Sequence, residues 1–176
     1  MNLLERLLHA VLNRLFERRD IVIDGKLYLR RWYLRGRGTG RQWFLHNIRL
    51  PDAGRSWHDH PWGFRTRVLW GGYTENVLRP NACLRCPEPH THVRPLLAGD
   101  RSEVSSRFTH RIDTVRGSTY TLVRAGTARR IWGFWVPDAG VPAGVRWVDW
   151  RTYLGLPPDA PDFLEDRVVV SPPQWW

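Results

Sequence analysis

The clearest chemical signal is a seven-residue segment in the middle of the chain, Ser56-Trp57-His58-Asp59-His60-Pro61-Trp62. In a β-strand, residues two apart point to the same face, so His58 and His60 share a face while Asp59 points to the other. Neutral imidazoles suit Zn, Fe, Cu and Ni. The pair therefore forms half of a candidate metal site, although two satisfied or surface histidines would produce the same pattern.

Two more histidines fall in nearby predicted strands. The turn sequence at 51–54 separates Gln42–Leu50 from Arg55–His60, and a hairpin centred there places His46 opposite His58 on the same face. His110 lies in a further short strand. Four of the seven histidines thus fall in three predicted strands, which favours a metal site.

The elements that must position these histidines are short and rich in β-branched and aromatic residues, with turn signals between them. This pattern, without interleaved helices, predicts an antiparallel sandwich or barrel. The region 79–99 holds four prolines and both cysteines, and we expect it to leave the sheet. The nine predicted strands are Ile21–Ile23, Leu27–Leu34, Gln42–Leu50, Trp57–His60, Phe64–Leu69, Tyr73–Leu78, His110–Thr114, Tyr120–Arg124 and Ile131–Val136.

The start of the chain has a different pattern. Apolar residues recur at helical spacing over Asn2–Arg19, which predicts an amphipathic helix. Three interpretations stay open for it: a helix packed on its own domain, a helix that forms a homodimer, and a basic membrane-surface helix. We expect three regions, namely a helix over 1–20, a barrel over 21–156 and a Pro- and Trp-rich tail over 157–176.

Composition limits the classes of protein. The chain has 176 residues, 42% of them hydrophobic, and a formal net charge of +10, which suit one globular domain. Its basic residues are spread along the chain without a block, so the pattern disfavours nucleic-acid binding. No run of 18 apolar residues predicts a membrane span, and the first 20 residues lack the features of a signal peptide. Two cysteines make no disulfide framework, so we expect a cytoplasmic protein.

The chain resembles the cupin superfamily from about Leu27 to Trp150. His58 and His60 fill the His-x-His positions of the first cupin motif, and Gly71 or Gly72 fills its closing position. The glycine and the histidine of the second motif correspond to Gly99 and His110. A group of small bacterial and phage cupin-like proteins is similar at the stretches His58-Asp59-His60-Pro61-Trp62, Gly71–Glu75, His110–Ile112 and Trp132–Trp135.

The chain also departs from the cupin pattern. The metal-binding Glu of the first motif falls at Phe64 or Arg65, and neither can replace it. Other motif positions hold Asp52, Ser105, Arg107 and Thr114. The resemblance therefore implies a three-histidine centre of His58, His60 and His110. Such a centre favours Fe(II), and Zn, Mn and Ni remain open because these ligands do not decide the metal.

Several residues are candidates for supporting roles around this centre. His46 or Glu75 could orient a ligand imidazole, although Glu75 would also fit a solvated strand position. Because the motif Glu is missing, we expect an anionic ligand such as a carboxylate or thiolate to complete the charge balance. Arg65, Arg111 and Arg124 are candidates for binding a substrate carboxylate.

The tryptophans near the histidine strands have two interpretations. They could form the barrel core, or they could build a dry aromatic wall around the metal. On an alternating strand, Trp132 and Phe134 face one way and Trp135 the other. The tryptophans concerned are Trp57, Trp62, Trp70, Trp132 and Trp135.

A second cluster of possible metal ligands comprises Cys83, Cys86, His90 and His92. Thiolates and imidazoles are zinc ligands, so a structural zinc could hold this loop together. Free thiols in a variable loop and a redox pair are the two alternatives. We expect the loop to be variable and free of metal.

These observations predict a mostly β protein, an antiparallel cupin-type β-barrel (double-stranded β-helix) with an N-terminal α-helix. Its expected function is that of a metal-dependent enzyme, a non-haem Fe(II)-type oxygenase that acts on a small anionic molecule. The alternatives are a non-catalytic small-molecule or metal-binding cupin and an interaction module that uses the Leu-rich helix. The expected partner is a small-molecule ligand, and homodimer formation stays open.

Overall fold

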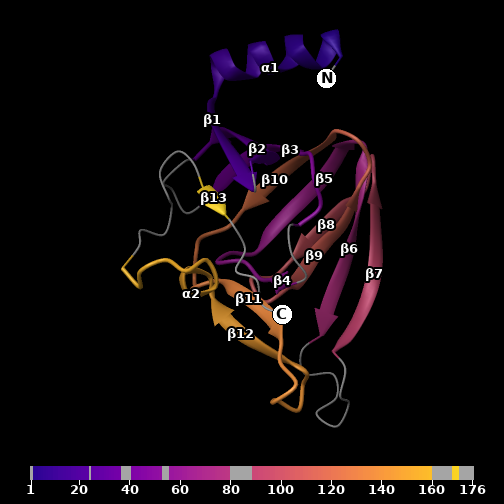
Figure 1. Cartoon of the computed structure of the whole chain (residues 1–176). Coiled ribbons are helices and arrows are strands. Elements are labelled where there is room, and N and C mark those ends of the chain that lie inside the picture. The colour runs from indigo at the N-terminus through magenta and orange to yellow at the C-terminus, as the bar shows by residue number, and fades with distance from the viewer. Residues whose placement is uncertain are drawn as a thin grey trace.

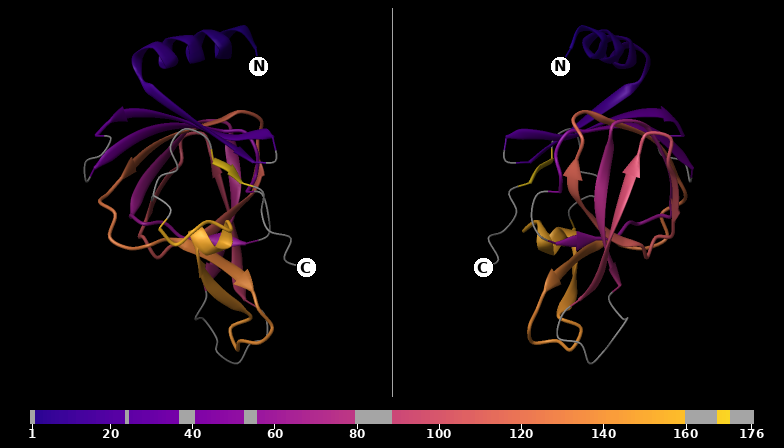
Figure 2. Two further views of the ribbon diagram at one scale, coloured as in Figure 1. Left: turned by 60° about the vertical axis from the view of Figure 1, so that its left-hand side comes forward. Right: turned by 90° about the vertical axis from the view of Figure 1, so that its right-hand side faces the viewer.

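Two β-sheets face each other and form an open, mostly antiparallel barrel of the cupin type (Figures 1 and 2). The computed structural model describes residues 2–23, 25–36, 41–52, 56–79, 89–159 and 168–170. The strand order is β13-β1-β2-β3-β10-β5-β8 in the first sheet and β12-β11-β4-β9-β6-β7 in the second. The pairing of β1 with β13 is parallel, and the other pairings described are antiparallel.

The strands of the first sheet are β1 (Glu17–Ile23), β2 (Lys26–Arg35), β3 (Gln42–Ile48), β5 (Phe64–Trp70), β8 (Arg101–Val104), β10 (Thr119–Ala125) and β13 (Val168–Val170). The strands of the second sheet are β4 (Trp57–His58), β6 (Gly72–Arg79), β7 (His90–Leu97), β9 (Thr109–Val115), β11 (Gly133–Pro137) and β12 (Val145–Asp149). Two helices complete the fold, α1 (Leu3–Leu15) and α2 (Trp150–Tyr153). In the described part of the chain, neither helix has the length and apolar character needed to cross a bilayer.

All nine predicted strands are present, with ends shifted by a few residues. The sequence pattern missed β7, β8, β12 and β13. Part of the region expected to leave the sheet, namely 90–97, is the edge strand β7. An edge strand tolerates a proline such as Pro95 because one side of its backbone needs no ladder hydrogen bond.

The predicted hairpin around 51–54 is wrong. Strand β3 pairs with β2 and β10, whereas β4 pairs with β9 and β11 in the other sheet. The chain therefore crosses from one sheet to the other between β3 and β4. His46 and His58 consequently lie on opposing walls of the barrel and not on paired strands.

Helix α1 ends at Leu15, four residues before the predicted end. Asn2 caps its start by accepting a hydrogen bond from the Glu5 backbone N–H at 2.8 Å. Beyond Phe16 the backbone is extended, and β1 pairs with β2 from the Glu17–Tyr33 contact onward. Pairing in the sheet therefore overrides the helical periodicity of residues 16–19.

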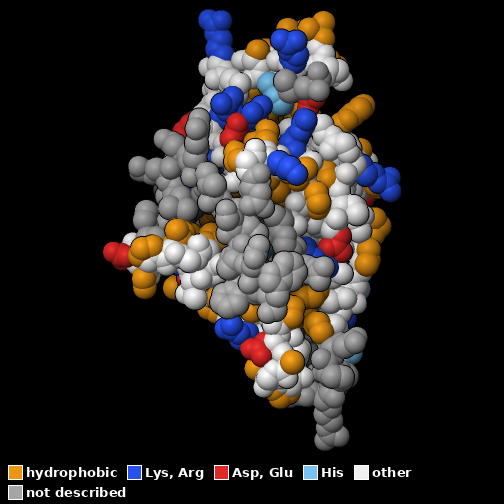
Figure 3. Space-filling model, viewed as in Figure 1, with side chains coloured by type: hydrophobic (Ala, Val, Ile, Leu, Met, Phe, Trp, Pro, Cys, Tyr) orange, Lys and Arg blue, Asp and Glu red, His pale blue; other side chains and the backbone are white. Residues whose placement is uncertain are grey.

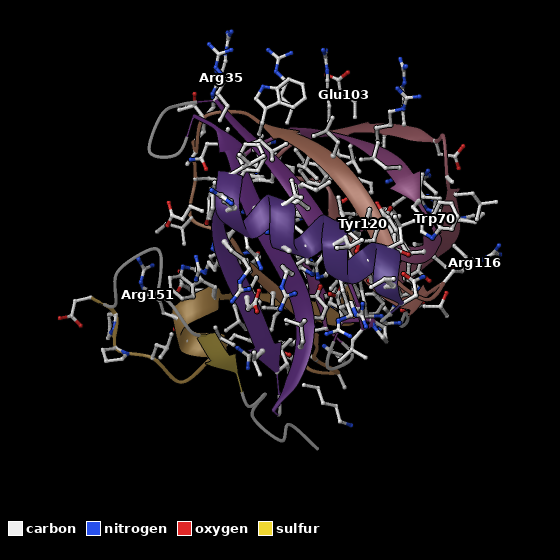
Figure 4. All side chains as sticks on the ribbon, turned by 90° about the horizontal axis from the view of Figure 1, so that it is seen from above. Arg35, Trp70, Glu103, Arg116, Tyr120 and Arg151 are labelled. Atoms are coloured by element: carbon white, nitrogen blue, oxygen red, sulfur yellow. The ribbon has the colours of Figure 1, made fainter. Side chains whose placement is uncertain are left out.

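The orientation of α1 is the reverse of that expected for a helix packed on its own domain. It lies across the outer face of the first sheet, close to Tyr120 (Figure 4), and its inward contacts are made by His9, Leu12 and Asn13. Hydrophobic and basic side chains gather on α1 at the top of the molecule (Figure 3). The exposed apolar residues of the helix are Leu3, Leu4, Leu7, Leu8, Val11 and Leu15.

This orientation predicts effects of very different size on stability for two leucine-to-alanine substitutions in α1. Leu12 is 8% exposed and packs with Trp32 and Tyr120, so Leu12→Ala should lower the free energy of unfolding by about 2–3 kcal/mol. Leu7 is 57% exposed, so Leu7→Ala should change it by less than about 0.5 kcal/mol. Urea unfolding of the two variants measures both values. An equal loss for Leu7→Ala would contradict the exposed position of that side chain.

An apolar core lies between the two sheets. Leu29, Ile48 and Val68 of the first sheet pack against residues of the second sheet, namely Tyr73, Leu96 and Ile112. Gly71 supplies the sharp turn between β5 and β6 with a φ of +75°, and a Cβ there would lie 2.6 Å from the Thr119 hydroxyl. The remaining space between the sheets holds the cavity described next.

Candidate metal centre

Three histidines meet on the inner face of the second sheet. His58 is the last residue of β4 and lies opposite His110 of β9, and His60 follows two residues later in the chain. One ring nitrogen from each lies within 4.8 Å of the other two. The Nε2 atoms of His60 and His110 are 2.9 Å apart.

This geometry fits a divalent metal ion. Metal–imidazole distances of 2.0–2.1 Å place neighbouring ligand nitrogens about 2.9–3.4 Å apart, so His60 and His110 have suitable spacing. The ligand nitrogens of all three histidines lie within 4.8 Å of one another, so a small movement of the His58 ring would bring its nitrogen to the same spacing. His58, His60 and His110 could therefore hold the ion, with no carboxylate in the set.

A buried carboxylate orients His110. The Nδ1 atom of His110 lies 3.0 Å from Oε1 of Glu75, whose other oxygen accepts a hydrogen bond from Nε of Arg94 at 2.9 Å. Glu75 is buried and is therefore not a solvated strand residue. Burial alone raises the pKa of Glu75, but the hydrogen bond with His110 and the charge of Arg94 lower it overall. The ionised carboxylate directs Nε2 of His110 toward the other two histidines.

Asp52 has a similar relation to His58, although the sequence indicated only a turn residue that replaces the glycine of the first motif. Its Oδ2 lies 3.6 Å from Nδ1 of His58 and accepts a hydrogen bond from the Ile112 backbone N–H at 2.6 Å. The Tyr28 hydroxyl donates to its other oxygen. These contacts hold the carboxylate in place beside His58, so two of the three histidines have an acidic neighbour.

Asp59, between the two ligand candidates, points away from them as strand alternation predicts. Its carboxylate accepts hydrogen bonds from the backbone N–H of Gly133 at 2.9 Å, from Arg130 at 2.8 Å and from Nε1 of Trp147 at 3.1 Å. A Cβ on Gly133 would lie 2.2 Å from the Val148 carbonyl oxygen, so only glycine fits there. Asp59 therefore ties the histidine segment to β11 and β12.

Three of the cavity histidines, His46, His58 and His60, are neutral near pH 7. Burial lowers the pKa of His58 to about 4, although Asp52 opposes the shift. Burial and the neighbouring His58 and His110 hold the pKa of His60 well below its usual value. For His46, burial and the charge of Arg31 act in the same direction. Neutral imidazoles keep a lone pair available for a metal.

These shifts predict that the metal-free protein loses stability in acid. In the unfolded chain a histidine titrates near pH 6.5, whereas in the folded chain His46 stays neutral to a much lower pH. As the pH falls from about 6.5 toward this lower value, the unfolded state binds more protons than the folded state. The free energy of unfolding should therefore fall by up to about 1.4 kcal/mol per pH unit for each such histidine. Urea unfolding between about pH 7.5 and pH 5 measures the slope. His46→Gln should reduce it, whereas substituting the exposed His92 should not.

A cavity of about 660 Å³ extends from the three histidines between the two sheets. His46 and Arg31 line it from the first sheet, and Nε of Arg31 donates a hydrogen bond to Nε2 of His46 at 2.9 Å. Among the described residues, His46 is not part of the group that could bind a metal ion. It lies across the cavity as a partner of Arg31.

The arginines suggested by the sequence lie elsewhere. Arg65 is exposed and paired with Glu103 at 2.9 Å, so it cannot face the metal. Arg111 lies over Trp57 and pairs with Asp113, and Arg124 lies over Trp43. The arginines that line the cavity are instead Arg19, Arg31 and Arg130. In the sequence, the alternation Leu29-x-Arg31-x-Tyr33 in β2 could have indicated that Arg31 faces the interior. Arg30 and Trp32 alternate in the same way, so the sequence did not show which face of β2 points inward.

Phe64 occupies the inward position of the missing motif Glu. Its ring lies 4.8 Å from that of His60 and lines the cavity. Trp62, Trp132 and Phe134 also line the cavity, which supports the aromatic-wall interpretation for Trp62 and Trp132. Trp57 and Trp135 pack in a separate core cluster, and Trp70 is 70% exposed, pointing outward in Figure 4.

The second predicted cluster is only partly described. Cys83 and Cys86 lie outside the described residues. His90 and His92 lie on the edge strand β7 and are exposed. They are separate from the three-histidine group, which leaves a zinc site in this loop as a prediction that the structure does not test.

Comparison with protein-family models gave no match, and comparison with curated proteins gave none. Solved structures are similar in fold. Streptomyces albus HEPD with 2-hydroxyethylphosphonate and Fe(II) bound has a TM-score of 0.50 and 16% identity, over 84% of this chain and 28% of HEPD. Fe(II) HppE has a TM-score of 0.47 and 15% identity, over 62% of this chain and 56% of HppE. An oxalate decarboxylase variant from Bacillus subtilis has a TM-score of 0.47 and 12% identity, over 64% of this chain and 28% of the decarboxylase. This chain therefore spans about a quarter to a half of the length of these proteins, and the likeness concerns the fold.

Proposed function

We propose that this protein is a divalent-metal-dependent enzyme, an oxygenase of the non-haem Fe(II) type that acts on a small anionic molecule. The observation that supports this function best is the convergence of three imidazoles, from His58, His60 and His110, inside a cavity of about 660 Å³. That volume lies in the range of small-molecule sites. The proposal includes membership of the cupin-like group that carries the His58-Asp59-His60-Pro61-Trp62 motif.

The chemistry follows from the ligand set. Iron held by three imidazoles would supply open coordination positions for a substrate atom and for dioxygen side by side. The chain supplies the orientation of the ligands through Glu75 and Asp52. Phe64, Trp132 and Phe134 exclude water from the wall of the cavity, which strengthens electrostatic interactions there.

The preference for an anion follows from charge. Three neutral imidazoles leave the full 2+ charge on the ion, and Phe64 stands where a carboxylate would have reduced it. Asp52 is held by Tyr28 and the Ile112 backbone, beside His58 and not among the ligand set. An anionic group on the substrate would balance the remaining charge.

Oxygen consumption tests the proposal. The purified protein is stripped of metal, reloaded with Fe(II) without oxygen, and then mixed with oxygen and a panel of small carboxylic and phosphonic acids. We expect one equivalent of iron and substrate-dependent oxygen uptake that Zn-loaded protein and His60→Ala lack. One equivalent of iron without any acid-dependent uptake would favour a non-catalytic metal-binding protein. Failure to bind iron would contradict the metal centre itself.

A further inference from the structure

Arg31 is the least compensated charge in the cavity. It extends from β2 into the cavity, where burial lowers its pKa, yet a guanidinium stays protonated in proteins. Its hydrogen bonds go to two neutral partners, His46 and Tyr33. Its guanidinium carbon also lies 4.7 Å from the centre of the Phe44 ring. None of these contacts neutralises the positive charge.

The surroundings of Arg31 increase the positive potential. Arg19 of β1 is its register partner and lines the same cavity. In the described part of the chain, no carboxylate forms an ion pair with Arg31. A partly buried charge that lacks a counter-ion is costly, so the position of Arg31 points to an anion that completes it.

The other cavity arginine is already neutralised. Arg130 pairs with the buried Asp59 at 2.8 Å and also donates a hydrogen bond to the Ser106 carbonyl oxygen. Arg130 therefore stabilises the cavity wall through its contacts with Asp59 and Ser106, whereas the charge of Arg31 remains available to a ligand.

Arg31 and the three histidines face one space. Arg31, His46 and the three histidines of the candidate metal centre all line the same cavity. The ring of Phe44 stacks on that of His46, at 5.6 Å between centres, and Phe64 packs against His60. An apolar surface thus connects the guanidinium with the metal centre.

We infer that Arg31, held in place by His46 and Phe44, is the binding site for an oxyanionic group of the ligand. The ligand is then a small acid with an apolar or aromatic body. Its carboxylate or phosphonate lies on Arg31 at the wall of the first sheet, and its other end reaches the three histidines of the second sheet. A guanidinium is well suited to this role because it binds planar carboxylates and phosphonates through paired N–H donors.

This inference refines the proposed function, but its test does not need the metal. Calorimetric titration of the metal-free protein compares phenylacetate with its neutral isostere phenylacetamide, and benzylphosphonate serves as the second oxyanion. We expect both acids to bind at least about tenfold more tightly than the amide. Arg31→Met should remove the difference, and Arg31→Lys should keep part of it. The matched control is Arg65→Met on the outer surface, which should keep all of it.

Two results would overturn the inference. One is equal affinity of the acids and the amide for the metal-free protein, and the other is a preference for acids that survives Arg31→Met. A preference that appears only after metal loading assigns the anion to the metal and not to Arg31.

Discussion

Replacement of His58, His60 or His110 by alanine is expected to reduce the bound divalent metal from one equivalent to less than about a tenth of an equivalent. Each substitution removes one of only three protein ligands, and among the described residues no other side chain joins the group to replace it. Elemental analysis of the purified, iron-loaded variants measures the loss. Circular dichroism confirms that each variant is folded.

The matched control is His92→Ala. His92 is an exposed histidine on the edge strand β7, outside the cavity, so its variant should keep full metal content. His46→Ala should also keep the metal because His46 lies across the cavity with Arg31. Full metal content in all three variants of the centre would show that the ion, if bound, lies elsewhere.

The second large effect is expected at Asp59. Asp59→Ala should lower the free energy of unfolding by about 2–4 kcal/mol, because it removes a buried carboxylate that accepts hydrogen bonds from three donors. The donors concerned are the Gly133 N–H, Nε1 of Trp147 and the Arg130 guanidinium. Denaturant unfolding at neutral pH measures the change. We also expect weaker metal binding, since Asp59 holds the segment between His58 and His60.

The control for Asp59 is an ion pair on the surface. Glu103 pairs with Arg65, and both side chains are more than half exposed. Glu103→Ala should therefore cost no more than about 1 kcal/mol. If Asp59→Ala costs as little as Glu103→Ala, the three hydrogen bonds to the buried carboxylate do not stabilise the fold.

Strands with strong alternation were predictable from the sequence because burial of one face imposes a period of two on the residues. This holds for β5, where Thr66 and Val68 are buried between exposed residues. Strands β7 and β8 are short or mostly exposed edge elements, so their sequences carry little of that period. The end of α1 was missed because the pairing of β1 with β2, a tertiary contact, decides it.

The sequence by itself determined which residues could form a metal centre. The His-x-His spacing places two imidazoles on one face, and His110 completes the set through a resemblance in motif spacing. The orientation of Asp59 also follows from local alternation, since strand geometry depends only on neighbouring residues.

Only the tertiary structure decided what surrounds the centre. The chain crosses between the sheets after β3, which puts His46 on the opposite wall and brings Arg31 into the cavity in place of Arg65. Asp52 reaches His58, and Glu75 reaches His110, through pairings between strands distant in sequence. Such contacts depend on sheet order and register, and a one-residue change in register would turn every side chain of a strand to the other face. Local sequence pattern does not contain that information.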